Sequence, residues 1–180
     1  MFQTPTLMQI DLQNLFFAAK NRGKKVDFEK IWHHFHERES EFLTDAIVYM
    51  VNSPTFNSKK FENKLKNIGY NIRIKKAERI HNSDKIIYKQ TDHDVNITIE
   101  CLDRIQQFDK WILMSGDGDF VDLCSYLKKK EKTIEIWSFQ ENFNSSLDPY
   151  IDRTHFIEDE FFYSPPNIHV FGFNQRNRFK

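Results

Sequence analysis

Two aspartates stand one residue apart in the segment SGDGDF, residues 115–120, directly after the apolar run KWILM. Asp117 and Asp119 occupy a glycine-containing turn between an expected strand and an expected helix. Neighbouring carboxylates repel each other unless a cation lies between them, so this spacing indicates a divalent metal site. A calcium EF-hand is excluded because apolar residues follow where its loop needs further acids and a glycine. Asp117 alone could equally be a helix N-cap.

The elements that must position these residues alternate between strand and helix along the chain. Strands are expected over residues 6–12, 45–51, 70–77, 110–115 and 133–139, and helices over residues 14–23, 26–40, 58–69, 92–108, 118–132 and 145–151, with a short strand or loop at 84–90. This order is typical of a parallel α/β sheet with helices on both faces, whose ligands bind beyond the carboxyl ends of the strands. Asp11 ends the first strand, so we expect it to converge with Asp117 and Asp119 at one sheet edge.

A fourth aspartate, Asp94, lies in the first turn of the helix expected around residues 93–107. At 100° per residue, the buried side of that helix is expected to carry Val95, Ile99 and Leu102, flanked by Thr98, Cys101 and Ile105. Asp94 falls on this side and is therefore directed at the sheet edge, whereas Glu100 and Asp103 are expected to be solvated. A purely structural role for Asp94, stabilised by the helix dipole, stays open.

Length and composition favour one soluble domain, which we place at residues 1–160, followed by an aromatic and basic tail at 161–180. The 26 basic and 26 acidic residues cancel, so no global charge attracts nucleic acid or an anionic membrane. Apolar runs are far shorter than the roughly 20 residues that cross a bilayer, and the N-terminus lacks a secretion pattern. Cys101 and Cys124 have no zinc-site spacing and are expected to be buried thiols. We therefore expect a cytoplasmic protein without a membrane partner.

Charge is nevertheless distributed unevenly along the chain. Residues 59–89 hold ten lysines and arginines against three acids, and residues 92–119 hold seven acids against two basic residues. A basic segment next to an acidic one is what a nucleic acid would need if its phosphates bind the basic residues while the acidic residues hold a metal ion. The expected nucleic-acid contacts are Lys75, Lys76, Arg79 and Lys89. The alternative for any single lysine is that it only solvates an outer helix face.

Four segments resemble, in order and spacing, the NYN domains of the LabA-like group in the PIN-like nuclease superfamily. They are IDLQNL (10–15), KQTDHDVNITIE (89–100), ILMSGDGDFVDLCSYLKKKEKTIEI (112–136) and SSLDPYIDRTHFI (145–157). The family typically shows D-x-x-N-L, K-G-V-D-V, S-G-D-S-D-F, and S-x-x-L followed by D-x-F-I. The resemblance covers about residues 7–157. It implies a PIN-like three-layer α/β/α sandwich with a central, mainly parallel sheet, and a ribonuclease that depends on Mg²⁺ or Mn²⁺.

The resemblance also implies roles for individual residues. The catalytic and metal-binding residues that it implies are Asp11, Asp94, Asp117 and Asp119, with Asn14 and Ser115 in support. This chain departs from the family pattern at Thr91-Asp92-His93, which replaces Gly-Val, at Glu100, where many relatives carry aspartate, and at Gly118, which replaces serine. Glu100 could therefore have a role in the site that its place on the helix does not predict.

The expected substrate is RNA, single-stranded or structured, with tRNA among the candidates. One alternative is a catalytically silent RNA-binding or scaffold protein of the same fold. Another is a Toprim-like phosphoryl-transfer enzyme, but that class expects glutamate where the first strand ends in Asp11. The tail could stack on bases, dock on its own domain or mediate a homodimer.

Overall fold

The computed structural model describes residues 3–38, 40–52, 58–82, 85–89 and 92–163. Its strands are β1 (Thr4–Asp11), β2 (Glu41–Asn52), β3 (Asn71–Lys76), β4 (Glu78–Asn82), β5 (Lys85–Lys89), β6 (Lys110–Met114), β7 (Thr133–Ser138) and β8 (Arg153–Phe156). Its α-helices are α1 (Leu12–Asn21), α2 (Phe28–His36), α3 (Ser58–Ile68), α4 (Asp94–Asp103) and α5 (Val121–Lys129). Short 3-10 helices complete the described part, namely η1 (Gly118–Phe120), η2 (Gln140–Asn142), η3 (Ser145–Tyr150) and η4 (Asp159–Phe161).

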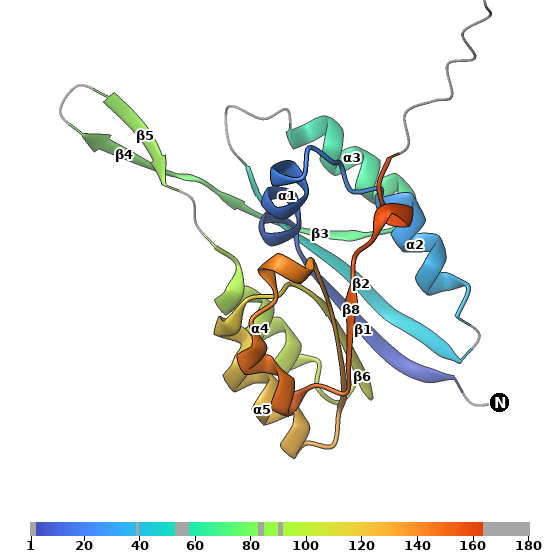
Figure 1. The fold of residues 1–180 in the computed structure, drawn as a ribbon. Coiled ribbons are helices and arrows are strands. Elements are labelled where there is room, and N and C mark those ends of the chain that lie inside the picture. The colour runs from blue at the N-terminus through green and yellow to red at the C-terminus, as the bar shows by residue number, and fades with distance from the viewer. Residues whose placement is uncertain (1–2, 39, 53–57, 83–84, 90–91, 164–180) are drawn as a thin grey trace, which may run out of the picture.

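Six strands form one sheet in the order β3-β2-β1-β6-β7-β8, and every neighbouring pair is parallel (Figure 1). The chain begins at β1 in the middle, builds outward through β2 to β3, and then returns to place β6 on the other side of β1. The strand order therefore reverses between β1 and β6. In an open parallel sheet this reversal creates the crevice at the carboxyl ends where ligands bind.

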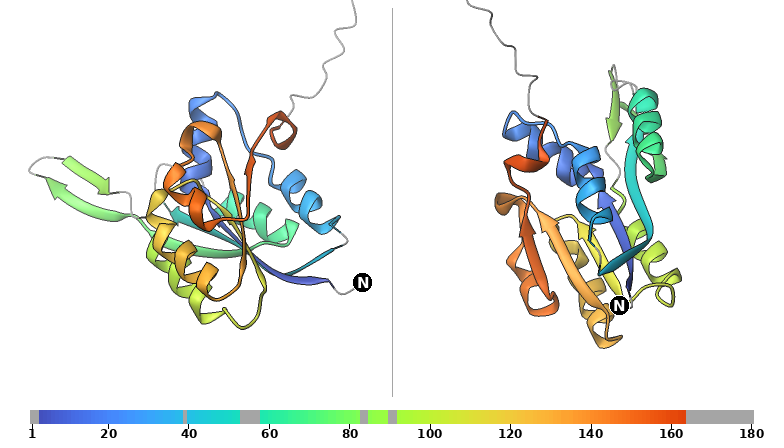
Figure 2. Two further views of the ribbon diagram at one scale, coloured as in Figure 1. Left: turned by 60° about the horizontal axis from the view of Figure 1, so that its bottom comes forward. Right: turned by 90° about the vertical axis from the view of Figure 1, so that its right-hand side faces the viewer.

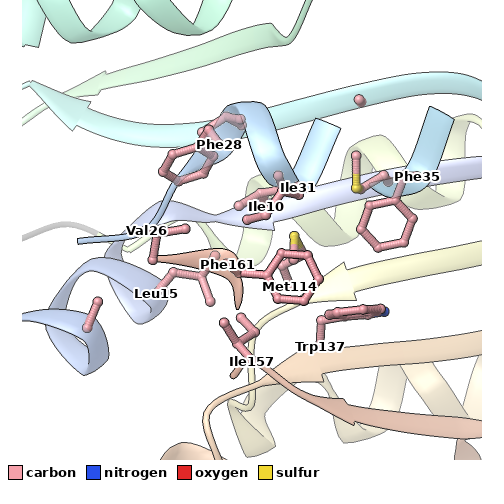
Figure 3. Packing of buried hydrophobic residues seen from close by; sticks show 14 of the residues in the cluster. Ile10, Leu15, Val26, Phe28, Ile31, Phe35, Met114, Trp137, Ile157 and Phe161 are labelled. Carbon is pink, nitrogen blue, oxygen red and sulfur yellow. The ribbon is translucent and has the colours of Figure 1, made fainter. Parts of the chain in front are cut away.

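Helices cover both faces of the sheet, which gives the predicted three layers (Figure 2). On one face, α1, α2 and α3 pack over a core that includes Ile10, Met114, Phe35 and Trp137 (Figure 3). On the other face, α4 and α5 pack over a second core around Trp111. The central strands are apolar on both sides because both sides are covered. The prediction of an α/β/α sandwich with a mainly parallel sheet is confirmed.

Local signals explain several element boundaries. Asp27 caps α2 by accepting hydrogen bonds from the backbone N–H groups of Glu29 and Lys30. Gly69 follows α3 with φ +128°, and a Cβ at this position would lie 2.4 Å from the Trp32 ring. Only glycine combines that backbone conformation with that close approach, so the helix ends where the sequence predicts.

The sequence prediction missed some strands. β8 was not expected, and β2 begins four residues before the predicted start at residue 45. Strands β4 and β5 form an antiparallel hairpin that projects away from the sheet between β3 and α4 (Figures 1 and 2). The segment predicted as a short strand or loop at 84–90 contains β5. The side chains of this hairpin lie outside the described part of the structure.

The predicted buried side of α4 is right for Cys101 but wrong for Val95, Ile99 and Leu102. Ile97 and Cys101 are fully buried, whereas Val95, Ile99 and Leu102 are 64%, 53% and 36% exposed. The helix carries two apolar stripes, and helical periodicity alone cannot tell which of them packs against the sheet. Cys101 and Cys124 are buried free thiols, as predicted.

The first residues of the expected tail pack against the domain. Phe161 and Phe162 are 5% and 2% exposed and belong to the core under α1 and α2. The carbonyl of Phe161 accepts a hydrogen bond from the backbone N–H of Asp27, and the N–H of Tyr163 donates to the carbonyl of Lys25. The remainder of the tail lies outside the described residues. Within the described part, no helix is both long and apolar enough to cross a membrane.

Candidate active site

Asp11 joins the end of β1 to the start of α1. Its Oδ1 accepts hydrogen bonds from the backbone N–H groups of Gln13 and Asn14, at 3.1 and 3.3 Å, and so caps α1. The residue is only 7% exposed. Burial raises the pKa of Asp11 to about 6; the capping bonds oppose this rise and the charge of Asp117 adds to it. The fold therefore holds a carboxylate here whose ionised form is disfavoured.

The turn after β6 lies beside Asp11 because β1 and β6 are adjacent, with Ile10 opposite Met114. Ser115 is fully buried between the two elements. Its Oγ donates to Oδ2 of Asp11 at 3.4 Å and accepts from the backbone N–H of Asp117 at 3.3 Å. The structure thus places Ser115 between two of the predicted site residues, where it links β1 to the turn.

Asn14 and Asp119 complete this side of the site. The Oδ1 of Asn14 is 3.5 Å from the backbone nitrogen of Gly116, at the outer limit of a hydrogen bond. Oδ1 of Asp117 accepts a hydrogen bond from the N–H of Asp119 at 3.1 Å, so Asp117 does cap a helix, the 3-10 helix η1. Capping engages one carboxylate oxygen of Asp117 and is compatible with metal binding by the other.

Asp94, the first residue of α4, interacts electrostatically with the other predicted aspartates. Burial raises its pKa to about 7, and the charges of Asp11, Asp92, Asp117 and Asp119 contribute to the rise in that order. The four aspartates predicted from the sequence therefore act on one another at the carboxyl edge, between α1, α4 and the turn after β6. Asp92 joins this group electrostatically, although the sequence did not single it out for the site.

The donor set fits a hard divalent cation. Carboxylate oxygens are the ligands that Mg²⁺ and Mn²⁺ prefer. The raised pKa values of Asp11 and Asp94 show that negative charge is costly here, and a divalent cation offsets that cost. In the described part of the chain, no group of three or more acidic, histidine or cysteine side chains is already arranged to hold an ion. The ligand set of four aspartates therefore stays a prediction.

Glu100 is not solvated, and that prediction is wrong. Its carboxylate accepts hydrogen bonds from the Tyr49 hydroxyl, Arg73 Nε and Arg104 Nη2, each at 2.9 Å. The side chain is 18% exposed. Because α4 packs through Ile97, Glu100 comes to face β2 and β3, so it ties the helix that begins with Asp94 to the sheet. Asp103 is exposed, as predicted.

The segment before Asp94 departs from the family pattern and has a structural role here. His93 is 2% exposed, and its Nε2 lies 2.9 Å from the carbonyl oxygen of Met50. Lys75 Nζ donates to the backbone carbonyl of Asp92 at 2.8 Å. These contacts attach the start of α4 to the ends of β2 and β3.

Two of the four predicted nucleic-acid contacts lie at the same end of the sheet. Lys75 and Lys76 end β3, the strand next to β2, and Lys76 is exposed. Arg79 and Lys89 belong to the projecting hairpin, and their side chains lie outside the described part of the structure. The two lysines are thus placed at the carboxyl edge, on the side where the hairpin leaves the sheet.

The loop after β7 packs against the aspartate turn, which the sequence analysis did not anticipate. A Cβ at Gly116 would lie 2.2 Å from Ser138 Oγ, and one at Gly118 would lie 2.3 Å from Asn144 Nδ2. Both glycines therefore allow close packing of segments far apart in the chain. The sequence feature that could have indicated this packing is the glycine at position 118, where the family pattern has serine.

A parallel sheet covered on both faces, with aspartates at the carboxyl ends of its central strands, is the arrangement that the resemblance to PIN-like domains implies. The family model described as "NYN domain" matches residues 5–158, and the chain belongs to the NYN family within the PIN-like nuclease superfamily. The chain is 26% identical over 149 residues to "Low amplitude and bright protein LabA" from Synechococcus elongatus, covering 79% of this chain and 80% of that protein.

A solved structure shares the fold. The crystal structure of a protein of unknown function from Vibrio parahaemolyticus aligns with a TM-score of 0.74 and 21% identity. The alignment covers 89% of this chain and 97% of the Vibrio chain. At this level of identity the likeness concerns the fold alone.

Proposed function

We propose that the protein is an endoribonuclease that hydrolyses RNA phosphodiester bonds with Mg²⁺ or Mn²⁺ held by Asp11, Asp94, Asp117 and Asp119. The observation that carries this proposal is the buried carboxylate of Asp11 and the partly buried one of Asp94 at the strand-order reversal. Burial and the charges of the neighbouring aspartates raise the pKa of Asp94 to about 7. A divalent cation bound at this point would offset the cost of these negative charges, and carboxylates with shifted pKa values are typical of functional sites. Membership of the NYN family supports a nuclease.

In this proposal the cation and the surrounding residues have different roles. A bound cation would polarise the phosphodiester, lower the pKa of an attacking water and stabilise the leaving 3′-oxygen. Ser115 and the cap of α1 hold the Asp11 carboxylate in place, and the Glu100 contacts hold α4 so that Asp94 stays at the edge. The expected products carry 5′-phosphate and 3′-hydroxyl ends, as the family resemblance implies.

The substrate approaches along the basic side of the edge in this proposal. Lys75, Lys76, Arg79 and Lys89 would neutralise RNA phosphates outside the scissile bond. Single-stranded and structured RNA, tRNA included, are the candidates. We further propose that this takes place in the cytoplasm, in a domain of residues 1–160 whose core also takes in Phe161 and Phe162, and that the chain can form a homodimer.

The decisive experiment incubates the purified protein with single-stranded and structured RNA in Mg²⁺, Mn²⁺ or EDTA, and sequences the fragments. We expect cleavage that needs a metal and is lost in Asp117→Asn. Asp27→Asn is the matched control, because Asp27 is a buried helix cap outside the site. Cleavage that persists in EDTA contradicts the proposal. RNA binding without cleavage under every condition would instead support the catalytically silent alternative.

A further inference from the structure

One hydrogen bond holds Asn144 against the aspartate turn, and two more tie it to the start of η3. Its backbone N–H donates to the carbonyl of Gly116 at 2.9 Å, and its own carbonyl accepts from the N–H of Leu147 at 3.1 Å. Its side-chain Oδ1 accepts from the backbone N–H of Ser146 at 3.0 Å, which caps η3. Because Oδ1 is engaged in the cap, the amide orientation is set and Nδ2 is the group left without a hydrogen-bond partner in the described residues.

The Nδ2 group lies next to the residue between the two aspartates of the turn. A Cβ built on Gly118 would be only 2.3 Å from Nδ2, so the amide occupies the space that a side chain at position 118 would need. Asn144 is exposed to solvent. Within the described residues, no group accepts a hydrogen bond from Nδ2. A free N–H donor therefore lies against Gly118, the residue between Asp117 and Asp119.

We infer that Asn144 is a substrate-binding residue whose Nδ2 donates a hydrogen bond to a non-bridging phosphate oxygen of the RNA. This inference rests on the proposed function. A phosphodiester that approaches four carboxylates needs donors as well as a cation, and a neutral amide donates without competing for the cation or adding charge. Since the oxygen of this amide is already bound, the group recognises only acceptors.

The test measures RNA affinity by fluorescence anisotropy in Mg²⁺, on an Asp11→Asn background so that the RNA stays intact. Asn144→Ser keeps an η3 cap, because serine is a good N-cap, but it lacks Nδ2. We expect Asn144→Ser to weaken binding roughly 10-fold, as for a lost hydrogen bond to a charged group. Asn142→Ala, an exposed asparagine of the same loop, is the control and should bind normally. Affinity of Asn144→Ser within twofold of its parent overturns the inference.

A second pair of variants tests whether a side chain at position 118 and the Asn144 amide compete for one space. Gly118→Ser should displace the amide and weaken binding by a similar factor. In the double variant with Asn144→Ala, the serine hydroxyl occupies that space as a replacement donor, and we expect affinity to return toward the parent value. If the two losses instead multiply, position 118 and Nδ2 do not share a site and the inference is wrong.

The same measurements separate this inference from the proposed function. RNA binding that depends on Asn144, combined with no cleavage by the wild-type protein in any metal, overturns the nuclease proposal alone. Metal-dependent cleavage by an Asn144→Ser protein with unchanged KM and kcat overturns the Asn144 inference alone. A parent protein that does not bind RNA at all overturns both.

Discussion

Replacing Asp11 with asparagine should stabilise the protein while it abolishes activity. Asparagine keeps the shape of the side chain and can still accept the two capping hydrogen bonds at the start of α1. It also removes a buried negative charge that faces Asp117. The variant thus separates the structural role of Asp11 as a cap from its proposed role as a metal ligand.

The size of the effect follows from the pKa. Burial raises the pKa of Asp11 from 3.8 to about 6, and at about 1.36 kcal/mol per pKa unit this corresponds to about 3 kcal/mol. Because the folded pKa is above the unfolded one, the folded state holds more protons between these values. Below about pH 4 Asp11 therefore does not destabilise the wild-type protein. As the pH rises through about 6, ionisation of Asp11 lowers the free energy of unfolding. The Asp11→Asn variant has no such loss.

The assay compares urea unfolding and thermal melting of the two proteins in EDTA from pH 4 to pH 8. We expect equal stability near pH 4 and a gain for Asp11→Asn that reaches about 2–3 kcal/mol at pH 8, or roughly 4–12 °C in Tm for a chain of this size. Added Mg²⁺ should narrow the gap at pH 8, because it stabilises the wild type more. RNA cleavage should be lost.

The matched control is Asp27→Asn, which changes another helix cap that is also 7% exposed. Asp27 interacts electrostatically with Lys64, so removal of its charge should give no gain and at most a small loss of stability. If Asp11→Asn is less stable than the wild type at pH 8, or if its gain does not change with pH, burial does not penalise the Asp11 charge and the reasoning is refuted.

Three further predictions concern the same edge of the sheet. Asp117→Asn should reduce cleavage at least roughly 10–100-fold, the usual cost of disturbing a metal site, with an unchanged circular dichroism spectrum; an active variant would remove Asp117 from the ligand set. Glu100→Gln should lower the free energy of unfolding in urea by on the order of 1–3 kcal/mol, because it weakens a half-buried ion pair. At temperatures well below the Tm of the variant, kcat should be unchanged; a folded but inactive variant would assign Glu100 to the chemistry. The triple replacement of Lys75, Lys76 and Arg79 by alanine should weaken binding to all RNA sequences alike. The slope of log K against log salt concentration should become shallower by roughly 0.7 per lost phosphate contact; an unchanged slope would mean that RNA does not bind along these residues.

Local patterns in the chain were enough to predict the class of fold and to place Asp11, Asp117 and Asp119 at one edge of the sheet, whereas the full set of four aspartates also needed the resemblance to the NYN family. Apolar runs such as WILM indicate buried strands because parallel strands are covered on both faces. Asp11 and Asp117 follow such runs closely, and the carboxyl ends of neighbouring parallel strands meet at one edge. These conclusions depend on contacts within a few residues and on a general rule of sheet topology, so periodicity and turn chemistry were sufficient to reach them.

The buried side of α4, and therefore what Glu100 contacts, depends on the folded chain. The 95/99/102 stripe and the 97/101 stripe are both apolar, and the choice between them depends on Tyr49 and Arg73 from strands that are distant in the sequence. The same holds for the pKa of Asp94 and for the packing of Asn144 over Gly118. Burial, electrostatic repulsion and close packing between remote segments exist only once the chain has folded, and no local pattern encodes them.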